Sequence, residues 1–347
     1  MRSDMYTMNM MNKMNKMYTQ AVMIALIATI TACSSSGTEE VDFCEFPKTV
    51  TLEGKAIILP DDECRVLGMA DVVDDGYIYF SYDRPCALSA SDKNFTQFND
   101  FARKGQGPGE VSGVSPLFAV NPSNGCFTVY DPYLMKMYET SFDSDLALKE
   151  LISFPDEYKR YSPSQVVKLK NGSYVGARGD FNYGMVLYNP DSCAVAEWPL
   201  GADFDLNAPV SDEVSMRAIS YNLHRGIIGE IYGTLPIVIL HDENEDIVGK
   251  YNYSGYSQHT DPDNSIADCF MDLELSDSYV WLLFGDPDES DVSRVFTLDY
   301  EGNPIAEFII SPTYSIAIDE QERRLLSINP DIEDGNLTIY DLPDFLW

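Results

Sequence analysis

Short runs of alternating apolar and polar residues dominate the chain from residue 48 onward. Residues 77–82, 126–130 and 279–284 are rich in aromatic and β-branched side chains and are flanked by glycine, aspartate, asparagine or proline. A period of two between turn residues is typical of β-strands. Helical periodicity is nearly absent. The best candidate for a helix is residues 143–151, and this stretch is short. The pattern therefore predicts an all-β fold.

The strand–turn–strand unit recurs at a nearly constant interval. Similar units begin at residues 70, 118, 166, 270 and 314, so the intervals are 48, 48, 104 and 44 residues. The interval of 104 residues corresponds to two periods, and residues 214–245 fit the missing unit loosely. Repeats of this length are typical of propeller arrays. We therefore predict a six-bladed β-propeller whose blades have about four antiparallel strands each.

The two ends of such a chain are expected to meet in one blade. Residues 49–52 or 56–59 offer an N-terminal strand that would complete the last blade beside residues 336–340. This closure removes an open sheet edge and joins the ring. A pair of β-sandwiches is the alternative fold, but it would not require so even a period.

The first 33 residues have the composition of a targeting signal. Lys13 and Lys16 precede an apolar stretch at residues 21–30, and small residues lead to Cys33. This order is typical of a secretory signal peptide. The stretch is too short for a membrane span, which needs about 20 apolar residues.

The end of this signal, Ile-Thr-Ala-Cys, resembles a bacterial lipobox, whose cysteine is lipidated and becomes the first residue after cleavage. An ordinary signal peptide with a chance cysteine is the alternative. We expect a signal peptide at residues 1–32, lipidation of Cys33, a polar tether at residues 33–47 and the propeller at residues 48–347. Several methionines precede Lys16, so the start codon could lie downstream of Met1.

The charge of the chain excludes one class of partner. The chain has 347 residues, with 56 Asp and Glu against 23 Lys and Arg, and its formal net charge is −33. Removing residues 1–32 takes away three basic residues and one acidic residue, which leaves −35. Nucleic acids bind mainly to basic surfaces, so we expect no nucleic acid partner. Such a surface would be held at a membrane by lipid and not by basic residues.

Six cysteines follow Cys33 and leave the disulfide pattern open. An exported protein can form disulfides, and six cysteines can pair in 15 ways. No CxxC spacing indicates a zinc site or a redox motif. Unpaired thiols that act as small apolar residues are an equal alternative. The six are Cys44, Cys64, Cys86, Cys126, Cys193 and Cys269.

The clearest local motif is a spaced glycine triplet in the second unit. Residues 105–111 precede an apolar strand at 116–121 and a second strand at 125–131 that ends in Asp. This order resembles an NHL repeat, in which glycines are expected to supply turns with positive φ. A phosphate-binding loop is disfavoured, because the lysine precedes the glycines and the chain continues into a strand. The signature loop consists of Lys104, Gly105, Gln106, Gly107, Pro108, Gly109 and Glu110.

Residues 101–110 behind a lipobox resemble the TolB-like six-bladed propeller lipoproteins of Gram-negative anaerobes. The resemblance covers nearly the whole mature chain in layout, but only residues 101–131 in specific motif. It implies the fold and a cell-envelope location, at the outer membrane on its periplasmic or surface face. Members of that family mostly have no established activity, so it implies no chemistry.

Catalytic and metal-binding patterns are thin. The chain has three histidines, His224, His241 and His259, and no HExxH or GxSxG motif. Acidic loops at residues 242–246, 261–265 and 286–291 could offer oxygen ligands to Ca²⁺. They lack the EF-hand pattern, so solvated turns are the favoured interpretation. We expect no cofactor, with Ca²⁺ as the one candidate.

These observations favour a lipid-anchored propeller that acts as a binding or scaffold module for a protein or a glycan at the cell envelope, with no catalytic activity identified. The alternative is an envelope hydrolase or lyase that uses the central channel, with or without a metal. Two histidines that converge with carboxylates at one mouth of the channel would favour the enzyme.

Overall fold

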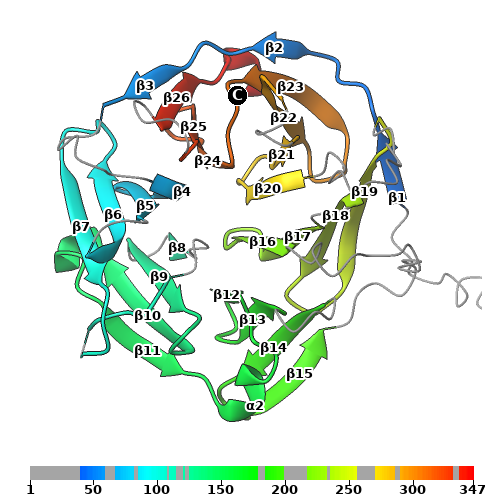
Figure 1. Cartoon of the computed structure of the whole chain (residues 1–347). Coiled ribbons are helices and arrows are strands. Elements are labelled where there is room, and N and C mark those ends of the chain that lie inside the picture. Colours follow the sequence, from blue (N-terminus) through cyan, green and yellow to red (C-terminus); the bar gives the residue numbers. More distant parts are fainter. Residues whose placement is uncertain are drawn as a thin grey trace, which may run out of the picture. The chain divides into compact units, whose positions relative to one another are not determined.

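Six sheets surround a common axis in the computed structural model (Figure 1). The structure describes residues 40–58, 67–81, 85–107, 109–114, 120–121, 125–178, 184–198, 217–232, 235–255, 270–285, 290–330 and 336–347. Each sheet has four or five strands, and sequential strands within a sheet are antiparallel neighbours. The chain is therefore a six-bladed β-propeller, as the repeat predicts. The β-sandwich alternative is wrong.

The blades follow one another along the chain. Blade 1 contains β4 (Leu67–Val73), β5 (Gly76–Ser81), β6 (Cys86–Asp92) and β7 (Phe98–Arg103). Blade 2 contains β8 (Val120–Asn121), β9 (Cys126–Asp131), β10 (Lys136–Ser141) and β11 (Lys149–Ser153). Blade 3 contains β12 (Gln165–Lys168), β13 (Tyr174–Ala177), β14 (Met185–Asn189) and β15 (Ala194–Trp198).

The second half of the ring repeats this plan. Blade 4 contains β16 (Arg217–Asn222), β17 (Ile227–Tyr232), β18 (Leu235–Asp242) and β19 (Ile247–Tyr253). Blade 5 contains β20 (Phe270–Leu275), β21 (Val280–Phe284), β22 (Ser293–Leu298) and β23 (Pro304–Ile310). Blade 6 contains β24 (Ser315–Asp319), β25 (Arg324–Ile328) and β26 (Leu337–Asp341).

The N-terminal strands wrap the outside of blades 4 to 6 (Figure 1). β1 (Glu40–Phe43) pairs in parallel with β19, and β2 (Thr49–Thr51) pairs in parallel with β23. β3 (Lys55–Ile57) pairs antiparallel with β26 and completes blade 6. The predicted closure is confirmed, with the second of the two candidate segments as the closing strand. β1 lies within the residues that were expected to form a tether.

Apolar side chains fill the six spaces between neighbouring blades. Successive residues of a strand point to opposite faces of its sheet, so each blade contributes to the core on both sides. Six separate apolar clusters result, one between each pair of adjacent blades. The aromatic runs noted in the sequence supply the largest buried side chains, among them Tyr77, Tyr130 and Trp281.

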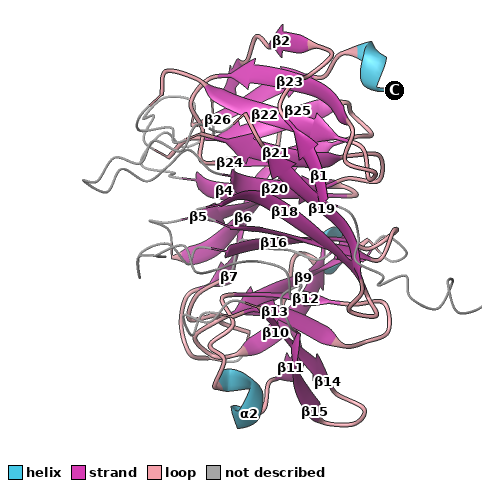
Figure 2. Cartoon of the chain, turned by 90° about the vertical axis from the view of Figure 1, so that its right-hand side faces the viewer, coloured by secondary structure: helices cyan, strands magenta, loops and turns pink. Residues whose placement is uncertain are grey.

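Helix is confined to short segments in the described part of the chain (Figure 2). These are α2 (Asp156–Lys159) and the 3₁₀ turns Phe142–Ser144 and Asp344–Leu346. The prediction of a helix at residues 143–151 is wrong. Asp145 and Leu146 both have positive φ, which ends the helical run, and the chain then enters β11. None of the described helices is long and apolar enough to cross a membrane.

The direction of the strands separates the loops of the ring into two sets. Turns between the first and second strands of a blade, and between the third and fourth, lie at the same end because neighbouring strands are antiparallel. We call this the turn end. Its first–second turns are residues 74–75, 169–173, 223–226, 276–279 and 320–323, together with the turn of blade 2. The opposite end carries the second–third turns and the connections between blades.

Candidate functional site

In blades 4, 5 and 6, a backbone N–H group of the innermost strand donates a hydrogen bond to a side chain of the preceding blade. An unpaired strand edge needs such partners, since a buried N–H without an acceptor is costly. The acceptors lie on β12, β16 and β20 and serve the next blade in each case. The bonds join Ile219 N to Gln165 Oε1 (2.9 Å), Leu275 N to Ser220 Oγ (3.2 Å) and Ile316 N to Asp272 Oδ2 (2.9 Å).

Acidic side chains gather where blades 5 and 1 approach the axis. Burial raises the pKa of Asp272 to about 6, although hydrogen bonds from the backbone of Ile316, from Ser315 and from the backbone of Leu273 oppose the rise. Burial, and then the charges of Asp71 and Asp272, raise the pKa of Glu274 well above its usual range. Carboxyl groups with shifted pKa values are common at functional sites. The innermost strand of blade 5 therefore carries two carboxyl groups whose pKa values are raised.

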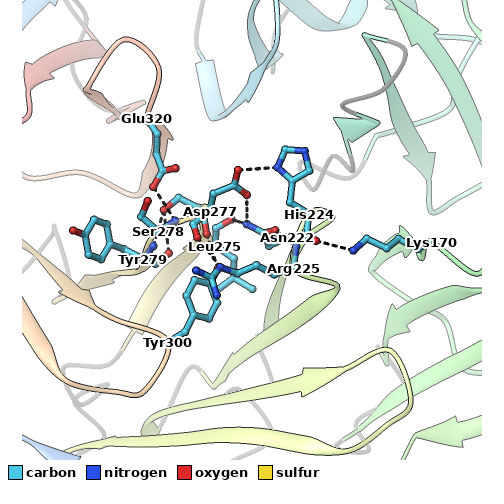
Figure 3. A network of polar contacts seen from close by, with 11 residues as sticks. Lys170, Asn222, His224, Arg225, Leu275, Asp277, Ser278, Tyr279, Tyr300 and Glu320 are labelled. Carbon is cyan, nitrogen blue, oxygen red and sulfur yellow. Dashed lines mark hydrogen bonds and ion pairs between the residues drawn. The ribbon is translucent and has the colours of Figure 1, made fainter. Parts of the chain in front are cut away.

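At the turn end, a polar network joins blades 4 and 5 (Figure 3). His224 Nδ1 lies 2.7 Å from Asp277 Oδ2, and Asn222 Nδ2 donates to Asp277 Oδ1 at 3.1 Å. The same amide donates to the carbonyl of Leu275 at 3.2 Å, which fixes its orientation. The side chains of His224 and Asp277 remain 59% and 53% exposed. They are held in place and still reach solvent.

Opposing effects set the acidity of Asp277. Burial raises the pKa of this carboxyl, but hydrogen bonds from His224 and Asn222 and the nearby charges of His224 and Arg225 outweigh it. The result is a pKa below the ordinary value. Asp277 is therefore a carboxylate at neutral pH and a stable acceptor for His224.

Arg225 extends the network outward along blade 5. Its Nε donates to the carbonyl of Asp277 at 2.6 Å, and its guanidinium lies 4.0 Å from the ring centroid of Tyr300. The Tyr300 hydroxyl donates to the carbonyl of Ser276 at 2.6 Å. Hydrogen bonding and cation–π stacking together position the exposed Arg225 side chain.

The network continues to the blades on either side. Lys170 of blade 3 donates through Nζ to the carbonyl of His224 at 2.7 Å and through its backbone N–H to Glu243 Oε1 at 2.9 Å. Glu320 of blade 6 accepts from the backbone N–H of Ser278 through Oε1 at 3.1 Å. Turns of four successive blades are thereby joined at one end of the ring.

Blades 6 and 1 meet through a buried ion pair. Lys93 Nζ lies 2.6 Å from Asp319 Oδ2, and the two side chains are 17% and 1% exposed. The Tyr77 hydroxyl donates to the same oxygen at 2.9 Å, and the backbone N–H of Glu322 donates to Asp319 Oδ1 at 3.0 Å. These bonds close the polar connections between the last blade and the first.

Aromatic side chains lie beside this network on blades 5 and 6. Tyr279 donates to the carbonyl of Leu346, and its ring lies 6.3 Å from that of Trp347. Trp347 and Phe345 are each 38% exposed. Arg323 faces the Trp347 ring at 6.0 Å. The turn end thus combines fixed charges with partly exposed aromatic rings.

The signature loop lies between β7 and β8, at the opposite end of the ring. Glu110 folds back so that its Oε2 accepts from the backbone N–H of Gly107 at 2.8 Å. A Cβ atom on Gly105 would lie 2.0 Å from that oxygen, and one on Gly107 would lie 2.9 Å from it. These glycines therefore make room for the Glu110 carboxylate. Only Gly109 has a positive φ, of 76°, so the expected conformational role applies to that glycine.

The rest of the loop explains other parts of the motif. Lys104 and Val111 form an isolated bridge that closes the loop, and Gln106 is exposed. Pro108 lies outside the described residues. Asp131, the residue that ends the second strand, is fully buried and accepts from the backbone N–H of Ser112 at 2.6 Å. The motif residues build a loop that is anchored on blade 2.

The histidines do not converge in the described part of the chain. His224 is exposed at the turn end, whereas His241 is 1% exposed and contacts Glu230 at 3.1 Å within blade 4. His259 lies outside the described residues. The condition that would favour the enzyme is therefore not met by these two histidines.

Of the three acidic loops, residues 242–246 are described and form a turn. Asp242 Oδ1 accepts from the backbone N–H groups of Asn244 and Asp246 at 2.8 and 3.0 Å. Residues 261–265 and most of 286–291 lie outside the described residues. Within the described ranges, no group of three or more His, Cys, Asp or Glu side chains could hold a metal ion.

Four of the cysteines lie within the described residues. Cys44 and Cys193 are exposed thiols, and Cys86 and Cys126 are half-buried. Cys33, Cys64 and Cys269 lie outside the described residues. The lipidation of Cys33 and the disulfide pattern therefore stay predictions.

The sequence points to His224 only as one of three histidines and does not single out Lys170, Asn222 or Asp277, with which His224 forms the turn-end network. Lys170, His224 and Asp277 follow the first strands of successive blades, and their bonded pairs are 53 or 54 positions apart. This separation is about one blade. Polar residues at the same place in successive repeats are the signal that could have identified them.

Comparison with known proteins extends the fold assignment. No protein-family model matches the chain, and no curated protein matches it in sequence. A solved structure of a DUF4221 family member from Bacteroides vulgatus matches with a TM-score of 0.53 at 11% identity, over 84% of this chain and 96% of that chain. A Bacteroides fragilis protein named as an exported protein matches with a TM-score of 0.56 at 11% identity, over 87% and 99%. At this identity the likeness shows the propeller fold, while the TolB-like assignment stays a prediction.

Proposed function

We propose that the protein is a lipid-anchored binding module of a bacterial cell envelope, and that a protein partner docks on its turn end. The observation that carries this proposal is the network of fixed but exposed polar groups at that end, which spans blades 3 to 6.

The location rests on the N-terminal sequence. Lys13 and Lys16, the apolar residues 21–30 and the lipobox-like residues 30–33 favour export followed by acylation of Cys33. The Bacteroides fragilis neighbour in fold is named as an exported protein, which agrees with this location. The outer membrane is the membrane that the family resemblance favours.

The bonding between the turns at the turn end favours a binding surface over a solvated surface that has no function. The turns of blades 3 to 6 are bonded to one another, so docking would require little ordering of side chains. Groups that are already fixed lose less entropy when a complex forms. His224 and Asp277 are more than half exposed and present hydrogen-bonding atoms to solvent.

The residue types favour a protein partner over a glycan. Arginine, tyrosine and tryptophan carry much of the binding energy of protein interfaces. Arg225 and Arg323 are exposed here, and Trp347 and Tyr279 are partly exposed beside them. Opposite charges lie side by side at this end, which suits a partner with a complementary pattern of charges.

Site-specific photocrosslinking in cells tests the docking face. A photoreactive phenylalanine analogue replaces Ser278 at the turn end, or Tyr133 as the control. Tyr133 is 78% exposed and follows the second strand of blade 2, so it lies at the opposite end. We expect a discrete, protease-sensitive adduct at position 278 that is absent at position 133. Equal adducts at both positions would refute the docking face, and a protease-resistant adduct would indicate a glycan.

The anchor is tested separately. Cys33→Ser should abolish incorporation of an alkyne-labelled fatty acid and release the protein from washed membranes. A control replacement of the exposed Cys44 by serine should leave both unchanged. Labelling that persists in the Cys33→Ser protein would show that the fatty acid is attached to another residue and not to Cys33.

A further inference from the structure

The outer edges of the six blades are not covered in the same way (Figure 1). Blades 4 and 5 each carry a fifth strand, β1 or β2, and β3 forms the outermost strand of blade 6. In the described part of the chain, β7, β11 and β15 are the outermost strands of blades 1, 2 and 3. An outermost strand presents unpaired backbone N–H and C=O groups, which can pair with another extended chain.

The covered blades show how an added strand binds to this fold. β1 and β2 pair in parallel with β19 and β23. Val41 and Phe43 of β1 point into the core between blades 4 and 5, while Glu40 and Asp42 are exposed. Val50 of β2 packs likewise between blades 5 and 6. In both cases the apolar side chains of the added strand face the next blade along the chain.

Two of the open edges carry features that discourage pairing. In β7, Ala102 has a φ of +55°, which departs from extended geometry, and Asp100 is exposed. The pairing of β11 with β10 is interrupted by a register shift, and β11 begins with the exposed residues Lys149 and Glu150. Bulges, irregular backbone and charged residues are the usual means by which proteins protect an edge.

β15 has a regular backbone within its five described residues, and Glu197 is the one charged residue among them. Its register with β14 is unbroken from Ala194 to Trp198, and its sequence contains no lysine or proline. Ala194 and Ala196 are exposed. A regular, exposed and largely apolar edge is the kind that pairs with another strand.

The side chains of β15 define what would fit beside them. Trp198 packs with Ile219 and Ile228 of blade 4, so Ala194 and Ala196, four and two positions before it, face the same side. On the covered blades this side of the added strand holds valine and phenylalanine. The small alanines leave room for such side chains. Glu197 faces the other side, with its side chain 61% exposed and 3.3 Å from Arg178.

We propose that β15 is a docking site for an extended segment of a partner protein, which adds to blade 3 as a parallel fifth strand. The segment carries apolar side chains at alternate positions beside Ala194 and Ala196, and a basic side chain beside Glu197. Its precedents are β1 and β2 of this chain, and its charge complements a protein with a formal net charge of −33. Strand addition of this kind draws affinity from backbone hydrogen bonds and specificity from alternate side chains. The site lies on the outside of the ring, so it is independent of the turn-end proposal.

A labelled heptapeptide of alternating lysine and valine tests this site by fluorescence anisotropy in physiological salt. The control peptide replaces the central valine by proline, which keeps the charge and removes a backbone donor. The protein variants Ala196→Lys and Asn99→Lys each add one positive charge to an exposed position on an outermost strand. We expect Ala196→Lys and the proline peptide each to weaken binding by about tenfold or more, and Asn99→Lys to change it by less than about twofold.

Hydrogen exchange read by mass spectrometry locates the contact. Peptide binding should protect the amides of residues 194–198 and leave those of β7 and β11 unchanged. Equal weakening by both lysine variants, protection on another blade, or no binding at millimolar peptide would each overturn the proposal. Protection of β15 in the protein alone would show that the chain's own segment covers the edge. If sedimentation also gave a dimer, a second copy would be the occupant.

Discussion

At the scale of single residues, the carboxyl group of Asp272 affects the fold in two ways. It satisfies the inner edge of blade 6 through the backbone N–H of Ile316, and it places a titratable group in the interior. A charged carboxylate is costly there, which is the reason for its raised pKa. The group therefore links the stability of the ring to pH.

We predict that Asp272 stabilises the protein more in acid than at neutral pH. Its folded pKa of about 6 exceeds its unfolded value of 3.8, so its contribution is complete below about pH 4 and is lost as the pH rises through 6. Relative to Asp272→Asn, the natural protein should gain up to about 3 kcal/mol of unfolding free energy between pH 7.5 and pH 4. Urea unfolding at both pH values measures this difference.

Asp277 provides the control with the opposite sign. Its pKa is lowered in the folded state, so its contribution is present above the unfolded pKa and lost as the pH falls through the folded pKa. Relative to Asp277→Asn, the natural protein should therefore lose stability on acidification. A difference between natural protein and Asp272→Asn that does not vary with pH would contradict the first prediction.

At the scale of elements, the N-terminal strands act as part of the fold and not as a leader to it. Phe43 of β1 is 3% exposed, and its ring lies within 6.3 Å of the rings of Phe46, Tyr253 and Phe296. A four-residue strand thus adds a large side chain to the core between blades 4 and 5. Removal of this side chain should therefore lower the stability of the whole ring.

We predict that Phe43→Ala lowers the free energy of unfolding by about 3–5 kcal/mol, because it leaves a cavity in a packed aromatic cluster. Glu40→Ala, at an exposed position of the same strand, should cost less than about 0.5 kcal/mol. Denaturant unfolding followed by tyrosine and tryptophan fluorescence measures both. A Phe43→Ala protein that unfolds at the natural midpoint would show that β1 does not contribute to the fold.

Elements differ in how far the sequence predicts them. The blades follow from a local pattern that repeats, so residues 70–80 and 118–129 can be recognised as equivalent from the order of their side chains alone. β1 and β2 have only four and three residues, and their pairing depends on strands more than 200 positions away. No local pattern encodes such a pairing. The turn-end network cannot be predicted from the sequence for a related reason, since Asn222 at the end of β16 and Asp277 in a turn of blade 5 are ordinary polar residues until the blades bring them together.

At the scale of the whole molecule, the ring must close between blades 6 and 1. Tyr77 and Lys93 belong to the first blade and meet Asp319 of the last blade. β3 closes blade 6 at its outer edge. The contact of Tyr77 and Lys93 with Asp319 holds blade 1 and blade 6 together. Both joints connect segments far apart in the chain, so both depend on the complete ring.

We predict that Lys93→Met lowers the free energy of unfolding by about 3 kcal/mol, because it leaves the Asp319 carboxylate buried without its cation. The chain provides a control with the same geometry at the surface. Lys136 Nζ lies 2.6 Å from Glu150 Oε2, but these side chains are 31% and 46% exposed. Lys136→Met should therefore cost less than about 1 kcal/mol. The double variant Lys93→Met with Asp319→Asn should be more stable than the sum of the single losses implies, since it removes both members of one interaction. Equal losses for Lys93→Met and Lys136→Met in urea unfolding would show that the buried pair does not hold the first and last blades together.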